Sequence, residues 1–131
     1  AIFILNFNLL NSSSSFFNEG IILFEKKNYK KSKIFFEKDI VFNPKSEKSY
    51  LYLAKIFKEE KKDILQENNL DTVLLINPKN EEAIYLLALL SIKKSNFSKA
   101  KELIGIMNLV CEEFCSSSTE LQKKLDSSLK K

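Results

Sequence analysis

The stretch Asn43-Pro44-Lys45-Ser46-Glu47 recurs further along the chain, with one change, as Asn77-Pro78-Lys79-Asn80-Glu81. In both stretches a polar residue comes directly before glutamate, and an apolar helical pattern follows. Such a polar side chain can accept hydrogen bonds from the free N–H groups of a helix, and glutamate suits the positive end of the helix dipole. Proline cannot continue a preceding helix. Each stretch therefore predicts a joint where one helix ends and the next begins.

Helical periodicity extends in both directions from these two joints. Up to seven segments can be drawn, over residues 15–27, 30–42, 47–60, 63–75, 81–94, 97–115 and 119–130. Glycine and proline occur only twice each, which disfavours a turn-rich β fold. The sequence therefore predicts an all-α fold.

The composition limits both the number of domains and the chemistry. A chain of 131 residues with 44% hydrophobic and 29% charged residues is typical of one soluble globular domain. It contains no histidine, and all 21 basic residues are lysine. Most acid–base catalysis, zinc binding and bidentate phosphate binding rely on histidine or arginine. The sequence therefore predicts a binding module with no catalytic residues, no metal and no cofactor.

The charge pattern also bears on the partner. The formal net charge is only +4, and 17 acidic residues are interspersed among the lysines. Nucleic-acid-binding proteins usually concentrate basic residues on one face and add arginine and aromatic contacts. We therefore predict a protein partner and no nucleic acid.

The two joints are separated by a period of about 34 residues, which with two helices per unit is typical of tetratricopeptide repeats, and the chain resembles this family. The three units are residues 13–46, 47–80 and 81–114. Matching positions are Phe16, Gly20, Tyr29, Ser32, Phe36 and Pro44 in the first unit, Tyr50, Leu53, Ala54, Phe57 and Pro78 in the second, and Leu87, Ala88, Phe97 and Ala100 in the third. The departures are Asp63, Gln66 and Val73 in the second unit and Ser91 and Glu112 in the third.

The resemblance implies an α-solenoid of three helix pairs. Small residues such as Gly20, Ala54 and Ala88 would let neighbouring helices approach closely, with larger side chains filling the space around them. Residues 119–130 would form a capping helix, because Leu121, Leu125 and Leu129 fall on one face and polar residues elsewhere. Asp39 stands where the family keeps an apolar or small residue.

The resemblance also implies a concave groove, lined by the first helix of each pair, that binds a peptide or another protein. The groove positions correspond to Phe17, Ile21, Phe24, Lys48, Leu51, Lys55, Lys58, Tyr85, Leu89 and Ile92. This would be an apolar floor with a lysine ridge, suited to a segment with apolar anchors and acidic residues. Phe17, Ile21, Tyr52 and Leu86 occupy positions that chaperone-binding members use to clamp a C-terminal carboxylate, so such a clamp is not expected.

Three functions fit this groove. The leading hypothesis is a non-enzymatic adaptor or assembly scaffold. The first alternative is a secretion chaperone that guards apolar segments of exported proteins. The second alternative is a structural protein that associates with itself.

The N-terminal residues 1–12 differ from the rest. Ala1–Leu10 is apolar except for Asn6 and Asn8, and ten helical residues span only about 15 Å, half a bilayer core. The segment could continue an upstream anchor or signal peptide, which favours the bacterial cell envelope over the cytoplasm. It could instead be a strap that fills the groove or joins two copies. Asn11–Ser15 is predicted as a polar linker, with Ser14 or Ser15 capping the next helix.

Cys111 and Cys115 are the only cysteines, four positions apart in a segment predicted as helical. On a helix their Cα atoms would be about 6 Å apart, with side chains poorly aimed at each other. A half metal site or a redox pair is the alternative, but a zinc site needs about four ligands. We therefore predict two small apolar packing residues.

Overall fold

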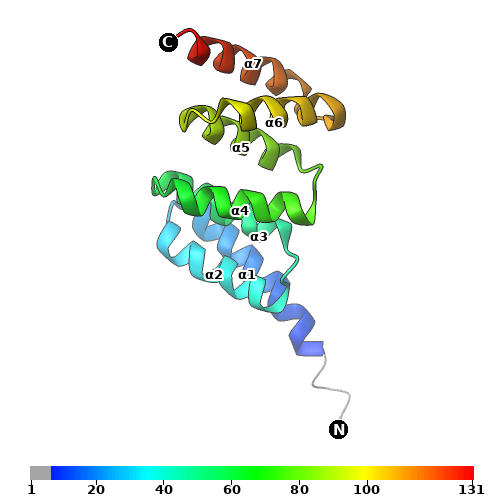
Figure 1. Cartoon of the computed structure of the whole chain (residues 1–131). Helices are drawn as coiled ribbons and strands as arrows, with labels where there is room; N and C mark the ends of the chain where they lie inside the picture. The colour runs from blue at the N-terminus through cyan, green and yellow to red at the C-terminus, as the bar shows by residue number, and fades with distance from the viewer. Residues whose placement is uncertain (1–6) are drawn as a thin grey trace.

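The computed structural model describes residues 7–131, and of residues 7–14 only the backbone. This part of the chain forms helices and no strands. The helices are α1 (Phe7–Glu25), α2 (Tyr29–Phe42), α3 (Glu47–Glu59), α4 (Asp63–Ile76), α5 (Glu81–Lys93), α6 (Phe97–Val110) and α7 (Cys115–Leu129). Figure 1 shows them stacked in chain order, with α7 at the end opposite the α1–α2 pair. The predicted all-α fold is confirmed.

The helices pack as three pairs. The main contacts within pairs are α1 with α2, α3 with α4 and α5 with α6, while α2–α3 and α4–α5 contacts join successive pairs. α7 packs against both α5 and α6. Each pair therefore contacts chiefly its neighbour along the stack, as the predicted solenoid requires.

Asparagine side chains cap the starts of three helices. Asn28, Asn80 and Asn96 accept hydrogen bonds from the third backbone N–H group of α2, α5 and α6, respectively. The expected cap at Ser46 is wrong, because its side chain makes no hydrogen bond to the start of α3. Its backbone N–H instead donates to the Asn43 carbonyl, 3.0 Å away. The first turn of α3 keeps a favourable acidic residue, Glu47.

The repeat extends to the backbone of the turns inside each pair. Lys27, Lys61 and Ser95 occupy the same position in successive repeats and adopt positive φ angles of 57°, 57° and 58°. Glycine adopts this left-handed region without the steric cost that other residues meet. The same turn therefore occurs three times, each time with a non-glycine residue in a backbone conformation that carries a steric cost.

The core has an aromatic and an aliphatic cluster. The aromatic cluster lies on α1–α3 and consists of buried Phe36, Leu53, Ile56 and Phe57 with partly buried Phe17, Ile21, Phe24, Tyr29, Ile40 and Tyr52. The aliphatic cluster extends from α3 to α7 and includes Leu70, Ile84, Leu87, Ile104, Met107, Leu121 and Leu125. Leu121 and Leu125 of α7 are fully buried, so the capping role predicted for residues 119–130 is supported, although the helix begins four residues earlier.

Close approach of α1 and α2 depends on Gly20. A Cβ atom on Gly20 would lie 2.7 Å from Cε1 of Phe36, inside any normal contact distance. The hydroxyl of Ser32 on α2 donates to the Gly20 carbonyl over 2.7 Å. Asp39, the polar residue at an apolar family position, is buried and accepts a hydrogen bond from the Ser49 hydroxyl over 2.5 Å. That bond joins α2 of the first pair to α3 of the second.

The start of α1 corrects the predicted linker. Residues 11–15 are helical within α1, so the expected linker and the cap at Ser14 or Ser15 are wrong. Serine and asparagine disfavour a helix only modestly, and extending an existing helix is far easier than starting one. Residues 1–6, where most of the apolar segment falls, lie outside the described residues. No helix of the described chain is both long enough and apolar enough to cross a bilayer.

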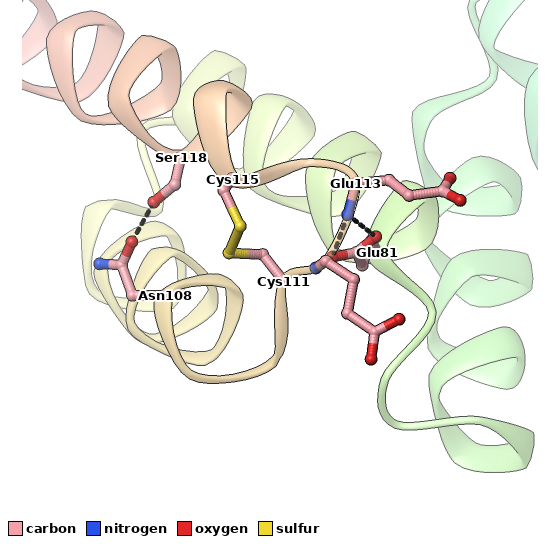
Figure 2. The surroundings of a disulfide bond; sticks show 7 residues. Glu81, Asn108, Cys111, Glu113, Cys115 and Ser118 are labelled. Atoms are coloured by element: carbon pink, nitrogen blue, oxygen red, sulfur yellow. Dashed lines mark hydrogen bonds between the residues drawn. A yellow bond between two sulfur atoms is a disulfide. The ribbon is translucent and has the colours of Figure 1, made fainter.

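The α6–α7 connection corrects the predicted cysteine arrangement. α6 ends at Val110 rather than at residue 115, because the backbone is extended at Cys111, with φ −63° and ψ 139°. The chain then turns through residues 112–114, and Cys115 begins α7. A disulfide joins the two cysteines, with Cα atoms 5.2 Å apart (Figure 2). A turn between the residues allows the bridge that a continuous helix would disfavour.

Candidate functional site

The predicted groove residues all lie on α1, α3 and α5, the first helices of the three pairs. Seven of them line hollows between these helices. One hollow holds Phe17, Ile21, Lys48, Leu51 and Lys55, and another holds Lys58 and Leu89. The groove positions are therefore shared between two hollows along the stack.

The first hollow has a volume of about 350 Å³ and lies where α1, α3 and the start of α5 meet. Phe17, Ile21 and Tyr52 supply apolar and aromatic surface. Leu51 is only 7% exposed, so it forms floor rather than a projecting anchor. Sequence reasoning missed three lining residues, Glu47, Asn80 and Glu82, and named Tyr52 only as the occupant of a clamp position.

Lys55 already interacts with two neighbours inside this hollow. Its ammonium lies 2.5 Å from a carboxylate oxygen of Glu82 and 4.7 Å from the ring centroid of Tyr52. Lys48, on the same helix, is exposed and forms no ion pair with the residues that the structure describes. Of these two lysines, Lys48 is the one available to an acidic partner.

The second hollow has a volume of about 490 Å³ and lies between the α3–α4 turn and the C-terminal half of α5. Its floor consists of Leu86, Leu89 and Leu90. Lys58 and Lys61 stand at its rim, exposed and without an ion pair among residues 15–131. The remaining lining residues are Asp63 and Lys93, which pair with each other over 2.9 Å, and Gln66.

A third hollow, of about 340 Å³, lies beside the disulfide loop. Glu81, at the start of α5, accepts hydrogen bonds from the backbone N–H groups of Glu112 and Glu113 (Figure 2). Leu51 borders both this hollow and the first one. Its charged lining residues are mainly acidic: Glu81, Glu82, Glu112 and Glu113, with Lys79 as the one basic residue.

The three other predicted groove residues are held by contacts within the chain. Phe24 packs against the rings of Tyr29 and Tyr52, at centroid distances of 5.4 and 5.1 Å. Ile92 packs against the aliphatic cluster. These two residues line neither the first nor the second hollow.

Tyr85 connects α5 to the end of the stack. Its ring lies 6.0 Å from that of Phe114, and its hydroxyl donates to a carboxylate oxygen of Glu120 on α7 over 3.4 Å. Burial raises the pKa of Tyr85 above its ordinary value, and the charge of Glu120 adds to the rise. Tyr85 therefore stays protonated and keeps its role as the hydrogen-bond donor.

Among the described residues, no three histidine, cysteine or acidic side chains come together in a way that could hold a metal ion. The hollows instead combine apolar floors with charged rims. Such surfaces can bury apolar groups and pair with charges, which is the chemistry of binding.

Solved structures similar to this chain share one fold. A tetratricopeptide repeat protein from Parabacteroides merdae has a TM-score of 0.83 at 19% identity over 90% of this chain, which spans 46% of that protein. The first TPR domain of Spaghetti, bound to an HSP90 peptide, has a TM-score of 0.81 at 14% identity, with 92% and 95% of the two chains covered.

A third similar structure is the Yersinia enterocolitica type III secretion chaperone SycD in complex with a peptide of the translocator YopD. Its TM-score is 0.78 at 12% identity, covering 88% of this chain and 91% of SycD. No protein-family model and no curated protein matches the sequence. With three helix pairs, a regular repeat period and these structural neighbours, the chain has the fold of a tetratricopeptide-repeat solenoid.

Proposed function

We propose that this chain is a non-enzymatic protein-interaction module. In this proposal, a segment of another protein lies along α1, α3 and α5 and inserts apolar side chains into the two hollows. The observation that carries it is the second hollow, where three leucines form a floor under unpaired Lys58 and Lys61. Apolar anchors in pockets contribute most of the binding energy in such interfaces, and rim charges chiefly set specificity.

The charges favour an acidic segment. Lys48 lines the first hollow, Lys58 and Lys61 line the second, and none of the three forms an ion pair among the described residues. An incoming carboxylate would pair with them without breaking an existing ion pair. The HSP90 peptide SRMEEVD bound by the similar Spaghetti domain is itself acidic, which supports this chemistry.

A secretion chaperone is the second candidate. The similarity to SycD, which holds a translocator peptide, favours it. The two candidates differ in the client: a chaperone would keep an aggregation-prone apolar protein soluble, whereas an adaptor would bind an already folded assembly. Light scattering of an aggregating apolar client, with and without this chain, separates them.

Site-specific photo-crosslinking tests the groove. A photoreactive amino acid at Leu89, in the second hollow, should capture a protein partner in native cells, whereas one at Ile34, an exposed residue on α2, should not. Capture from position 89 should fall at least tenfold with Lys48→Glu and Lys58→Glu combined, because both lysines would then repel acidic residues.

A matched control keeps the same charge change but moves it away from the hollows. Lys30→Glu with Lys101→Glu alters two exposed lysines on α2 and α6 and should leave capture unchanged. Equal capture from positions 34 and 89 would contradict the proposal. Crosslinks from position 89 only to residues 1–10 of the same chain would also contradict it, because the groove would then be closed from within.

A further inference from the structure

The joints after α2, α4 and α6 occupy equivalent positions in the repeat but differ in sequence. The first is Asn43-Pro44-Lys45-Ser46, and the second is Asn77-Pro78-Lys79-Asn80. We call the equivalent residues 111–114 the third joint. It has the sequence Cys111-Glu112-Glu113-Phe114, and Cys115 follows it. Only this joint carries a disulfide across its two ends.

The first two joints contain residues that end one helix and shape the turn to the next. Each has a proline, which cannot continue the preceding helix. A backbone hydrogen bond also closes each turn, from Ser46 to Asn43 over 3.0 Å and from Asn80 to Asn77 over 3.1 Å. The residues of these joints therefore fix the helix boundary by themselves.

The third joint lacks both features. Glu112 stands at the proline position, and within residues 7–131 no backbone hydrogen bond joins Phe114 to Cys111. Phe114 also caps α7 without offering a side-chain hydrogen bond to its first turn. Residues 111–114 include neither glycine nor proline, the two residues that helices tolerate least. The local sequence therefore does not oblige α6 to end at Val110.

Two contacts hold the third joint in its turn. The disulfide joins Cys111, directly after α6, to Cys115, the first residue of α7. The carboxylate of Glu81 accepts hydrogen bonds from the backbone N–H groups of Glu112 and Glu113 (Figure 2). In a continuing helix these N–H groups would donate to carbonyls of α6 instead. The disulfide thus stands where proline sets the boundary in the other two joints.

We propose that the Cys111–Cys115 disulfide is a redox-responsive site, and that its cleavage by a dithiol moves the boundary between α6 and α7 by about one helical turn. Without the bridge, α6 extends through Glu112 and Glu113. α7 then begins within the serines at 116–118, whose side chains are favoured helix caps.

The change is confined to the joint and to the third hollow. Leu121 and Leu125, the fully buried residues of α7, lie beyond the serines and keep their packing. Residues 112–114, which form one wall of the third hollow, give up their hydrogen bonds to Glu81. The inference concerns this wall and does not depend on a partner in the other two hollows.

The reaction is a thiol–disulfide exchange with a dithiol as the reductant. Cys115 is exposed and Cys111 is half-buried, so the first attack falls on the Cys115 sulfur. A thiolate of the dithiol forms a mixed disulfide with Cys115, and Cys111 leaves as a thiolate. The second thiolate of the reductant then attacks the reductant's own bound sulfur and releases Cys115. The dithiol ends as a disulfide, and its two protons end on the two cysteine sulfurs.

Nuclear magnetic resonance of the full chain, before and after dithiothreitol, tests the proposal. In a parallel sample, N-ethylmaleimide should add no group to the folded chain before reduction and two groups after it. On reduction, the backbone shifts of Glu112 and Glu113 should move to helical values, and those of Ser116 should leave them. Cys111→Ser with Cys115→Ser should show the boundary of the reduced form without any reductant.

Two double substitutions test whether helix extension is the cause. Glu112→Ala with Glu113→Ala, and Glu112→Gly with Glu113→Gly, remove the same two charges and keep both N–H donors to Glu81. Glycine disfavours a helix and alanine favours one. On reduction the alanine variant should therefore extend α6, whereas residues 112 and 113 of the glycine variant should stay non-helical. Equal helical shifts in the two reduced variants would contradict the proposal.

Three further results would overturn it. One is a disulfide that dithiothreitol leaves intact in the folded chain. Another is a reduced chain whose shifts over residues 111–118 match those of the oxidised chain, because the bridge would then not set the boundary. The last is a loss of helical shifts throughout α7 on reduction, which would make the bridge a stabilising cross-link instead of a switch.

Discussion

The first repeat and the two that follow solve the same packing problem with different side chains. A small residue of the first helix and a large residue of the second helix are both buried in every repeat. The pairs, at equivalent positions of the three repeats, are Gly20 with Phe36, Ala54 with Leu70, and Ala88 with Ile104. Where the first helix has glycine the second has a phenyl ring, and where it has alanine the second has a smaller aliphatic chain.

The difference shows that the repeat preserves the space filled at this position rather than the residue itself. Interiors are close-packed, so a smaller residue on one helix must be matched by a larger one on the other. Phe36 belongs to the aromatic cluster, whereas Ala54, Leu70, Ala88 and Ile104 belong to the aliphatic cluster. Two substitution experiments test this comparison, and two more test an exposed glycine and a set of ion pairs elsewhere in the stack.

The largest effect is expected from removing the ring. Phe36 is fully buried, and Phe36→Ala should lower the free energy of unfolding by about 3–5 kcal/mol in urea denaturation. Leu70→Ala, at the equivalent position, should cost about 2–5 kcal/mol. If Phe36→Ala cost less than about 1 kcal/mol, the aromatic cluster would not be a close-packed core.

The next effect comes from enlarging the glycine. Gly20→Ala places a Cβ atom 2.7 Å from the Phe36 ring and should destabilise the chain by about 1–3 kcal/mol. Combining it with Phe36→Leu recreates the alanine–leucine pair of the second repeat. A double-mutant cycle should show a favourable coupling of about 0.5–3 kcal/mol. Additive effects of the two substitutions would refute the idea of compensating volumes.

The same change at the other glycine should have the opposite sign. Gly105 is in the interior of α6 and exposed, with nothing near its Cβ position, so Gly105→Ala should stabilise the chain by about 0.5–1 kcal/mol. Urea denaturation measures the change. A destabilising result would show that Gly105 is needed within the chain.

The smallest effect concerns ion pairs between the second and third repeats. Hydrogen bonds from Lys94 and Lys99 hold the pKa of Glu67 below its ordinary value of 4.5. The folded state therefore favours ionised Glu67, and this contribution is complete above pH 4.5 and is lost as pH falls through the lower folded pKa. Glu67→Gln should reduce the acid-induced loss of stability by less than about 1 kcal/mol, since the pairs are partly exposed. An unchanged pH profile would show that these pairs contribute nothing.

The repeat period was sufficient to predict the number, order and pairing of the helices. It succeeded because Asn43–Glu47 and Asn77–Glu81 mark real joints and because Gly20, Ala54 and Ala88 fall where helices approach. The predicted groove residues do lie on the first helices, but which of them line a hollow depends on neighbours. Phe24 packs against two tyrosine rings, and Lys55 forms an ion pair with Glu82. Neither contact follows from the residue spacing alone.

Other features lay beyond reasoning from periodicity. The α6–α7 turn has no proline or glycine, so nothing in residues 111–114 signalled the end of α6 or the disulfide. The serines at 12–15 signalled a linker where the helix continues.

The serial packing of the helix pairs has a mechanical consequence. Because each pair contacts chiefly the next, a load applied to the two ends of the stack passes through every interface in turn. Every interface bears the same force, so the weakest interface is the one that opens first. The buried Asp39–Ser49 hydrogen bond crosses one of these interfaces, between α2 and α3, so it would bear load directly when the stack is stretched.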